Sequence, residues 1–419
     1  MEREERAYSL LKEIGFVRTG GSDEELKAAN IIIDRLKENG IKGKLESFEV
    51  QSSEISEAHL EITKPYKKTV NCTAYMCCKD TDAKGLKADL LYYEDNENEV
   101  LKKQAEGKVL LVNGYMGQAG FKKIYKDKPA AFITYNGHID YTEKFDLDQR
   151  EFRDTCMQYG SIPGVNIKVE DAMEMVERGA SEVKIVTKQT TKKIKSHNVV
   201  VDIDGWENKE RIVCTAHYDS VPFSKGYYDN GTGSVCLYEM ALYFAKNQPK
   251  HHMTFVWCGS EERGLLGSKA YCAKHEKKLD DVRLVVNIDM VGSIMGKRIA
   301  VSTAPQALVD YIDYYGKIKG FPIKSSQGVY SSDSTPFADK GIPAVSFARI
   351  TASGTGDIHS RNDVLEHLSP RLLKEDIDFI CDFTDNMANS FTIPVKKEMP
   401  DNMKKELDKY LCREDKPSK

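Results

Sequence analysis

Two histidines and several carboxylates stand in the second half of the sequence in surroundings that would suit metal binding. They occur in five short segments: His217-Tyr218-Asp219, Asp229-Asn230-Gly231, Glu261-Glu262, Asn287-Ile288-Asp289 and Asp357-Ile358-His359. Imidazole nitrogen suits zinc, and carboxylates can bridge two ions or fill the remaining ligand positions. Two divalent ions about 3.5–4 Å apart can share one water, lower its pKa and polarise a carbonyl group. The set therefore predicts a two-metal hydrolase.

Two features of these segments indicate which side chains would bind metal, act as a base or support a ligand. Glu261 and Glu262 are adjacent, so their side chains diverge, and one could bind metal while the other acts as a general base. Asp219 lies two residues after His217, on the same side of an extended strand. A metal-bound histidine usually donates its other ring N–H to such a carboxylate, which predicts a supporting role for Asp219.

Strands and helices alternate regularly from about residue 196 onward, and the five segments fall near strand ends. Apolar runs predict strands at 212–216, 253–258, 284–288 and 344–347, and helical patterns occur at 234–245, 265–275, 306–319 and 370–389. Continuous apolar strands separated by helices indicate an α/β fold with a mixed, mostly parallel sheet covered by helices on both faces. Ligands bind at the carboxyl ends of the strands in such sheets.

The middle of the chain has a different character. Strand-like runs at 88–93, 109–112 and 131–133 alternate with turns and short helical stretches, without clustered carboxylates and histidines. We therefore predict a catalytic domain from residues 1–50 and 193–395, with a helix at 24–40, and an inserted β-rich accessory domain at 51–192. The polar stretch 187–195 is expected to be the return connection. Residues 396–419 are highly charged and predict a solvated helix and a frayed tail.

Composition excludes several other classes of protein. The chain has 419 residues, a net charge of -4, and 30% charged residues mixed in sign along its length. It contains no apolar run of about 18 residues and no basic stripe, so neither a membrane nor nucleic acid is an expected partner. The charged start lacks the apolar core of a signal peptide. We therefore expect a cytoplasmic protein, with most of its 10 cysteines reduced and buried.

The motifs resemble those of the co-catalytic di-zinc aminopeptidases. The likeness is carried by His217-Tyr218-Asp219-Ser220, Asp229-Asn230-Gly231-Thr232-Gly233-Ser234, Ser260-Glu261-Glu262-Arg263-Gly264, Asn287-Ile288-Asp289-Met290 and Ser332-Asp333-Ser334-Thr335-Pro336. This resemblance implies a zinc-peptidase fold with two zinc ions per chain, bridged by Asp229, which also precedes a cis peptide bond. His217 and Asp289 would complete one metal site, and Glu262 and His359 the other. Glu261 would be the general base.

The resemblance is weaker in two places. The run at 162–167, followed by Glu170-Asp171-Ala172, is similar to a protease-associated domain, which implies that the insertion shapes the substrate entrance. Some relatives place a tyrosine directly before the last histidine to stabilise the oxyanion, but this chain has Ile358 there. Tyr330 is the candidate substitute. Asp333 is either a supporting residue of the site or a turn and N-cap residue.

An aminopeptidase acting on peptides with a free amino terminus is the leading hypothesis, and three alternatives stay open. A carboxypeptidase would need a cationic pocket, for which Arg349 and Arg361 are candidates. A glutaminyl cyclase-like enzyme would use one zinc ion and should lack part of the second site. A non-catalytic binding protein should have lost ligands or the general base. The side-chain preference, the physiological metal and the oligomeric state do not follow from the sequence.

Overall fold

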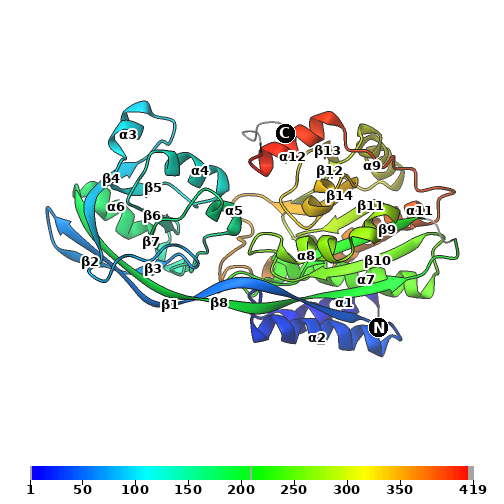
Figure 1. Cartoon of the computed structure of the whole chain (residues 1–419). Helices are drawn as coiled ribbons and strands as arrows, with labels where there is room; N and C mark the ends of the chain where they lie inside the picture. Colours follow the sequence, from blue (N-terminus) through cyan, green and yellow to red (C-terminus); the bar gives the residue numbers. More distant parts are fainter. Residues whose placement is uncertain (1, 208–209, 414–419) are drawn as a thin grey trace. The chain divides into compact units, whose positions relative to one another are not determined.

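The computed structural model describes residues 2–207 and 210–413 and divides the chain into two compact units (Figure 1). Unit 1 comprises Met1–Val50 and Lys195–Lys419, and unit 2 comprises Gln51–Ile194. The chain passes between them inside two long strands, β1 (Lys44–Lys64) and β8 (Glu182–Ile203). The stretch 187–195, predicted to be the return connection, lies inside β8, where the chain returns from unit 2 to unit 1. This stretch is polar because the side chains of residues 190–193 are exposed.

Unit 1 contains the mostly parallel sheet that the sequence predicts. Four adjacent strands run parallel in the order β14 (Ala344–Thr351), β11 (Val282–Ile288), β9 (Arg211–His217) and β10 (His252–Cys258). Beyond β14 lie β12 (Gly296–Thr303), which is antiparallel to it, and β13 (Lys324–Gln327). β8 pairs antiparallel with β10. The predicted α/β class is confirmed, whereas the strands β12 and β13 were not anticipated.

Both faces of this sheet are buried, which explains its continuous apolar strands. Along β9, Ile212, Cys214 and Ala216 belong to one hydrophobic cluster, and Val213 belongs to another. The first cluster is covered by α1 (Arg3–Ile14), α2 (Asp23–Glu38), α7 (Thr232–Lys246), α9 (Gln306–Lys319) and α11 (Pro370–Ala388). The second is covered by α8 (Leu266–Lys274), η3 (Glu276–Asp281), α10 (Ser334–Asp339) and α12 (Asp401–Tyr410).

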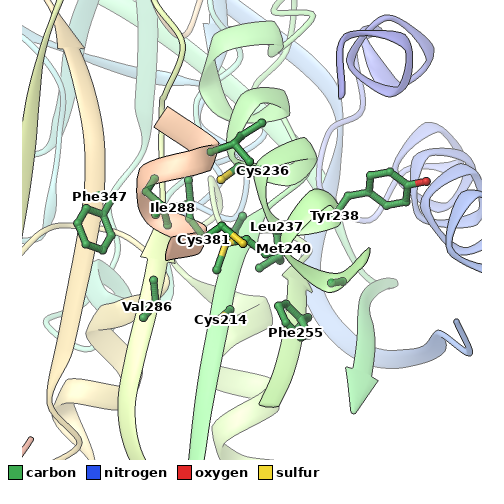
Figure 2. Close-up of a cluster of buried hydrophobic side chains, with 14 of the residues drawn as sticks. Cys214, Cys236, Leu237, Tyr238, Met240, Phe255, Val286, Ile288, Phe347 and Cys381 are labelled. Carbon is green, nitrogen blue, oxygen red and sulfur yellow. The ribbon is translucent and has the colours of Figure 1, made fainter. Parts of the chain in front are cut away.

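Buried cysteines fill part of the first cluster. Figure 2 shows Cys236 on α7 and Cys381 on α11 packed with Cys214 of β9, among Met240 and Phe255. All 10 cysteines are free thiols, and the three shown here are buried. Burial raises the pKa of the Cys381 thiol to about 12, so it behaves as a small hydrophobic side chain.

The charged C-terminal stretch does not lie entirely in solvent. In α12, Met403 and Leu407 are buried, and Leu407 joins the second hydrophobic cluster. These two side chains are four residues apart and therefore share one face of the helix. The prediction of a solvated helix is wrong for this segment, because two apolar residues among many charges suffice to dock it. The last residues of the predicted frayed tail, 414–419, lie outside the described residues.

Unit 2 has two hydrophobic clusters of its own. Its strands β4 (Leu86–Tyr93), β5 (Val109–Val112), β6 (Ala131–Asn136) and β7 (Gly164–Lys168) are parallel, and β3 (Cys72–Ala74) is antiparallel to β7. β2 (Lys68–Val70) pairs with β1. The helices are α3 (Glu99–Gln104), α4 (Gln118–Lys126), α5 (Asp154–Met157) and α6 (Val169–Glu177), with a short turn η1 (Thr142–Lys144). Among the described helices of the chain, none is both long and apolar enough to cross a membrane.

Candidate metal centre

The carboxyl ends of four neighbouring parallel strands bring the predicted ligands together. His217 is the last residue of β9, Glu261 and Glu262 follow β10, and Asp289 follows β11. His359 lies in the loop after β14. Because these strands are parallel and adjacent, their carboxyl ends meet at one edge of the sheet, where open α/β folds bind ligands.

The remaining ligand, Asp229, lies in the turn η2 (Tyr227–Gly231) at the start of α7. The peptide bond between Asp229 and Asn230 is cis, as the resemblance implies. The Asn230 side chain ties this turn to the end of β11: its amide group donates to the Ile288 carbonyl at 2.9 Å, and its oxygen accepts from the Met290 N–H at 3.0 Å. Asp229 is thereby held beside Asp289.

Asp229 directs its two carboxylate oxygens at two different histidines. Its Oδ1 lies 3.1 Å from His217 Nε2, and its Oδ2 lies 3.0 Å from His359 Nε2. His217 Nε2 is also 3.7 Å from Asp289 Oδ1, and His359 Nε2 is 3.1 Å from Glu262 Oε1. The structure thus forms two ligand groups, His217–Asp229–Asp289 and Asp229–Glu262–His359, with the ligand atoms of each within 4.8 Å of one another. All five predicted ligands are present in these groups.

The charges in this centre fit divalent cations. Burial disfavours the charged form of His217, but Glu261 and the carboxylates of Asp219, Asp229 and Asp289 raise its pKa well above the usual value. Glu262 does the same for the pKa of His359. Asp289 Oδ1 is buried and, among the described residues, accepts no hydrogen bond. The negative charge of such an acid-rich centre would be neutralised by divalent metal ions held on these nitrogens and oxygens.

Asp219 is close to His217 but has a second function in the structure. Its Oδ1 lies 3.6 Å from His217 Nδ1, which is too long for the predicted hydrogen bond. Its two oxygens instead accept from the backbone N–H groups of Glu261, at 3.0 Å, and Glu262, at 3.3 Å. The buried Asp219 therefore fixes the turn that carries both glutamates.

The predicted general base is buried beside the ligands. Glu261 is only 8% exposed and lies within 4.8 Å of His217 and Glu262 through their ligand atoms. Burial raises the pKa of Glu261 well above its usual range; His217 opposes this rise, and Glu262 adds to it. A carboxylate buried beside the ligands is a suitable acceptor for a proton from a water, as a general base must be.

Tyr330 and Asp333 come from the segment before α10. Burial, followed by the negative charges of Asp289 and Asp229, raises the pKa of Tyr330. Asp333 is fully buried at the start of α10 and makes no N-cap hydrogen bond. Burial raises the pKa of Asp333 to about 7, and Asp219 and Asp289 add to this effect. Its surroundings therefore favour a supporting role over an N-cap.

Sequence reasoning missed two buried residues that contact the ligand-bearing segments. Asp363 accepts hydrogen bonds from the backbone at Tyr228 and Asp229, and Arg18 donates to the carbonyl groups of Tyr218 and Gly226. Both side chains form hydrogen bonds with backbone groups. Because every residue has these groups, such contacts produce no recognisable sequence pattern. Four residues separate His359 from Asp363, but that spacing alone carries no chemical meaning.

A parallel sheet with two imidazole–carboxylate groups sharing one aspartate at its carboxyl edge defines a metal-dependent hydrolase. The comparisons with known proteins agree with this class. Residues 198–384 match the profile of peptidase family M28. The match covers less than half of the chain, and together with the aminopeptidase relatives it shows that the protein is a metallopeptidase.

Relatives extend the similarity to both units. The chain is 26% identical over 422 residues to Aminopeptidase YwaD of Bacillus subtilis strain 168, and the alignment covers 96% of this chain and 87% of the relative. It is 32% identical over 154 residues to Leupeptin-inactivating enzyme 1 of Streptomyces exfoliatus, but spans only 34% of that protein. A solved zinc aminopeptidase from Bacillus subtilis has the same fold, with a TM-score of 0.75, 23% identity and coverage of 94% of this chain and 97% of its own.

Proposed function

We propose that this metal-dependent aminopeptidase holds two zinc ions and removes single residues from the amino terminus of peptides. The proposal rests on the placement of the Asp229 carboxylate. Its Oδ1 lies 3.1 Å from His217 Nε2, and its Oδ2 lies 3.0 Å from His359 Nε2. A carboxylate placed in this way can serve two metal sites at once. The nearly full-length similarity to an aminopeptidase and the shared fold with a zinc aminopeptidase support the same function.

His217, Asp229 and Asp289 would hold one ion, and Asp229, Glu262 and His359 the other. Zinc at these positions would lower the pKa of a water and polarise the scissile carbonyl. Glu261, fixed by Asp219 through its backbone N–H, takes the proton from the attacking water and passes it to the leaving amine. The Tyr330 hydroxyl is the candidate donor to the oxyanion that would form on the substrate carbonyl.

The structure gives less support to the alternative reactions. The guanidinium of Arg349, a candidate for binding a substrate carboxylate, is buried and donates through Nε to the Ser293 carbonyl at 2.6 Å. It also lies 3.8 Å from Asp376, so its charge is directed into the protein. A one-zinc cyclase or a non-catalytic protein would be expected to lack ligands, whereas this chain contains both complete groups.

Metal analysis and substrate panels test this proposal. We expect two zinc ions per chain after gentle dialysis, and hydrolysis of aminoacyl anilides that disappears when the substrate amine is acetylated. The physical reason for the second result is the acid-rich centre, which can hold an ammonium group but gains nothing from a neutral amide. A stoichiometry that never exceeds one metal would refute the two-zinc centre. Equal rates on free and acetylated substrates would refute the aminopeptidase specificity.

A further inference from the structure

Asp363 binds the backbone of the turn that carries Asp229. Its Oδ1 accepts from the Tyr228 N–H at 2.7 Å, and its Oδ2 accepts from the Asp229 N–H at 3.0 Å. The residue is only 1% exposed. Two consecutive N–H groups bound to the two oxygens of one rigid carboxylate fix both the position and the rotation of this backbone segment.

Arg18 holds the same segment from the other end. Its fully buried guanidinium donates to the carbonyl groups of Tyr218, Lys225 and Gly226, the last at 2.8 Å. Its own backbone N–H donates to Ser220 Oγ at 3.1 Å. Arg18 therefore joins the strand end that carries His217 to the segment that leads into η2.

Arg18 and Asp363 bind neighbouring backbone groups of this segment and form no direct ion pair in the described structure. The hydrogen-bond acceptors of Arg18 are neutral carbonyl groups, and burial lowers its pKa to about 10. Asp363 is the first of the acids that oppose this lowering. Gly226, Tyr228 and Asp229 are therefore bound through their backbone by these two buried side chains.

The segment between these two side chains has no spare room. Gly226 has φ +57°, and a Cβ atom there would lie 2.7 Å from the Asp229 carbonyl and 3.0 Å from the Arg18 guanidinium. A Cβ atom on Gly231 would lie 2.8 Å from the Gly226 carbonyl. Gly226 and Gly231 therefore allow the turn to pack tightly against the Arg18 guanidinium. A small displacement of Arg18 or of Asp363 would move Asp229.

We propose that Asp363 and Arg18 are positioning residues that place Asp229 so that its two oxygens reach both His217 and His359. The inference rests on the proposed two-zinc function, because only a shared ligand needs this placement. A residue such as Glu262 serves one metal group, whereas a shift of Asp229 disturbs both. Loss of Asp363 should therefore weaken both metal sites together.

Asp363→Asn is the sharpest test, because asparagine keeps the shape but has only one acceptor oxygen. One of the two backbone N–H groups then faces an NH₂ group instead of an acceptor. We expect the affinity for both zinc ions, measured by competition with a chromophoric chelator, to fall about 10- to 100-fold, as is typical when a partner of a metal ligand is lost. Glu366→Gln is the matched control. It makes the same chemical change at an exposed position three residues away and should leave both affinities unchanged.

Arg18→Lys provides the second variant. Lysine keeps the positive charge but cannot span the Tyr218, Lys225 and Gly226 carbonyl groups with a rigid planar fork. We expect it to weaken both zinc sites as Asp363→Asn does, with far-UV circular dichroism unchanged and with kcat recovering at saturating zinc more than at equimolar zinc.

Three results would overturn the inference. Asp363→Asn could match Glu366→Gln, or it could weaken only one of the two zinc sites. Alternatively, both Asp363→Asn and Arg18→Lys could fail to fold even with excess zinc, which would show that the pair supports the fold and not the metal centre. If the unaltered protein itself binds fewer than two zinc ions, the proposed two-zinc function is refuted, whatever the variants show. The two failures are therefore distinguishable.

Discussion

Glu261 and Glu262 are neighbours in the chain, yet their carboxylates have different partners. Glu262 Oε1 lies 3.1 Å from His359 Nε2, whereas Glu261 is buried with its ligand atom near His217. We predict that Glu261→Gln keeps both zinc ions and lowers kcat by about 10²–10⁴-fold, because the amide cannot accept a proton. Glu262→Gln should instead lower zinc occupancy and recover part of its activity when zinc is added. Elemental analysis and rates at several zinc concentrations measure both effects.

The opposite pattern would reverse the two roles. Zinc loss in Glu261→Gln, with retention in Glu262→Gln, would make Glu261 the ligand and Glu262 the base. If both variants kept full activity, the chemistry would have to lie outside this turn. Asp219 binds the backbone of both glutamates, so each substitution leaves the turn itself in place.

At the scale of elements, α12 provides a test of docking through two apolar residues. Leu407 is 3% exposed and packs into the cluster on the second face of the sheet. We predict that Leu407→Ala destabilises unit 1 by about 2 to 5 kcal/mol, as is typical for a buried leucine. Both tryptophans, Trp206 and Trp257, belong to unit 1, so tryptophan fluorescence during urea unfolding reports on this unit. The exposed Lys405→Ala is the control, and equal midpoints for the two variants would mean that α12 contributes no packing.

The parts of the fold that the sequence could predict are those where burial dictates residue type. β9 reads as an apolar run because both of its faces are covered, and His217 at its end marks the site. The centre was predictable because its five ligands follow such strands or begin a helix. Asp363 and Arg18 could not be found in this way, since they contact backbone atoms that any sequence has. β8 was missed because its middle, at residues 190–193, is exposed and has the composition of a loop.

At the scale of the whole molecule, unit 2 has features expected of a domain that folds alone. It has two hydrophobic clusters of its own, and its two ends belong to the paired strands β1 and β8. Ser56 Oγ, for example, donates to the Lys188 carbonyl at 3.1 Å across this pair. We predict that residues 51–194, expressed separately, unfold in one cooperative transition followed by far-UV circular dichroism. A gradual, non-cooperative loss of signal would show that the unit depends on the rest of the chain.

Arg18 also bears on how such genes can recombine. It binds the Tyr218 carbonyl across a sequence separation of 200 residues and lies outside the 198–384 segment that matches the family profile. A crossover between two homologous genes anywhere from codon 19 to codon 217 would join an arginine from one parent to a turn from the other. Such a chimaera would inherit every zinc ligand intact and still depend on whether the two parents had placed that arginine alike. The heritable unit of this active centre is therefore longer than the set of residues that contact metal.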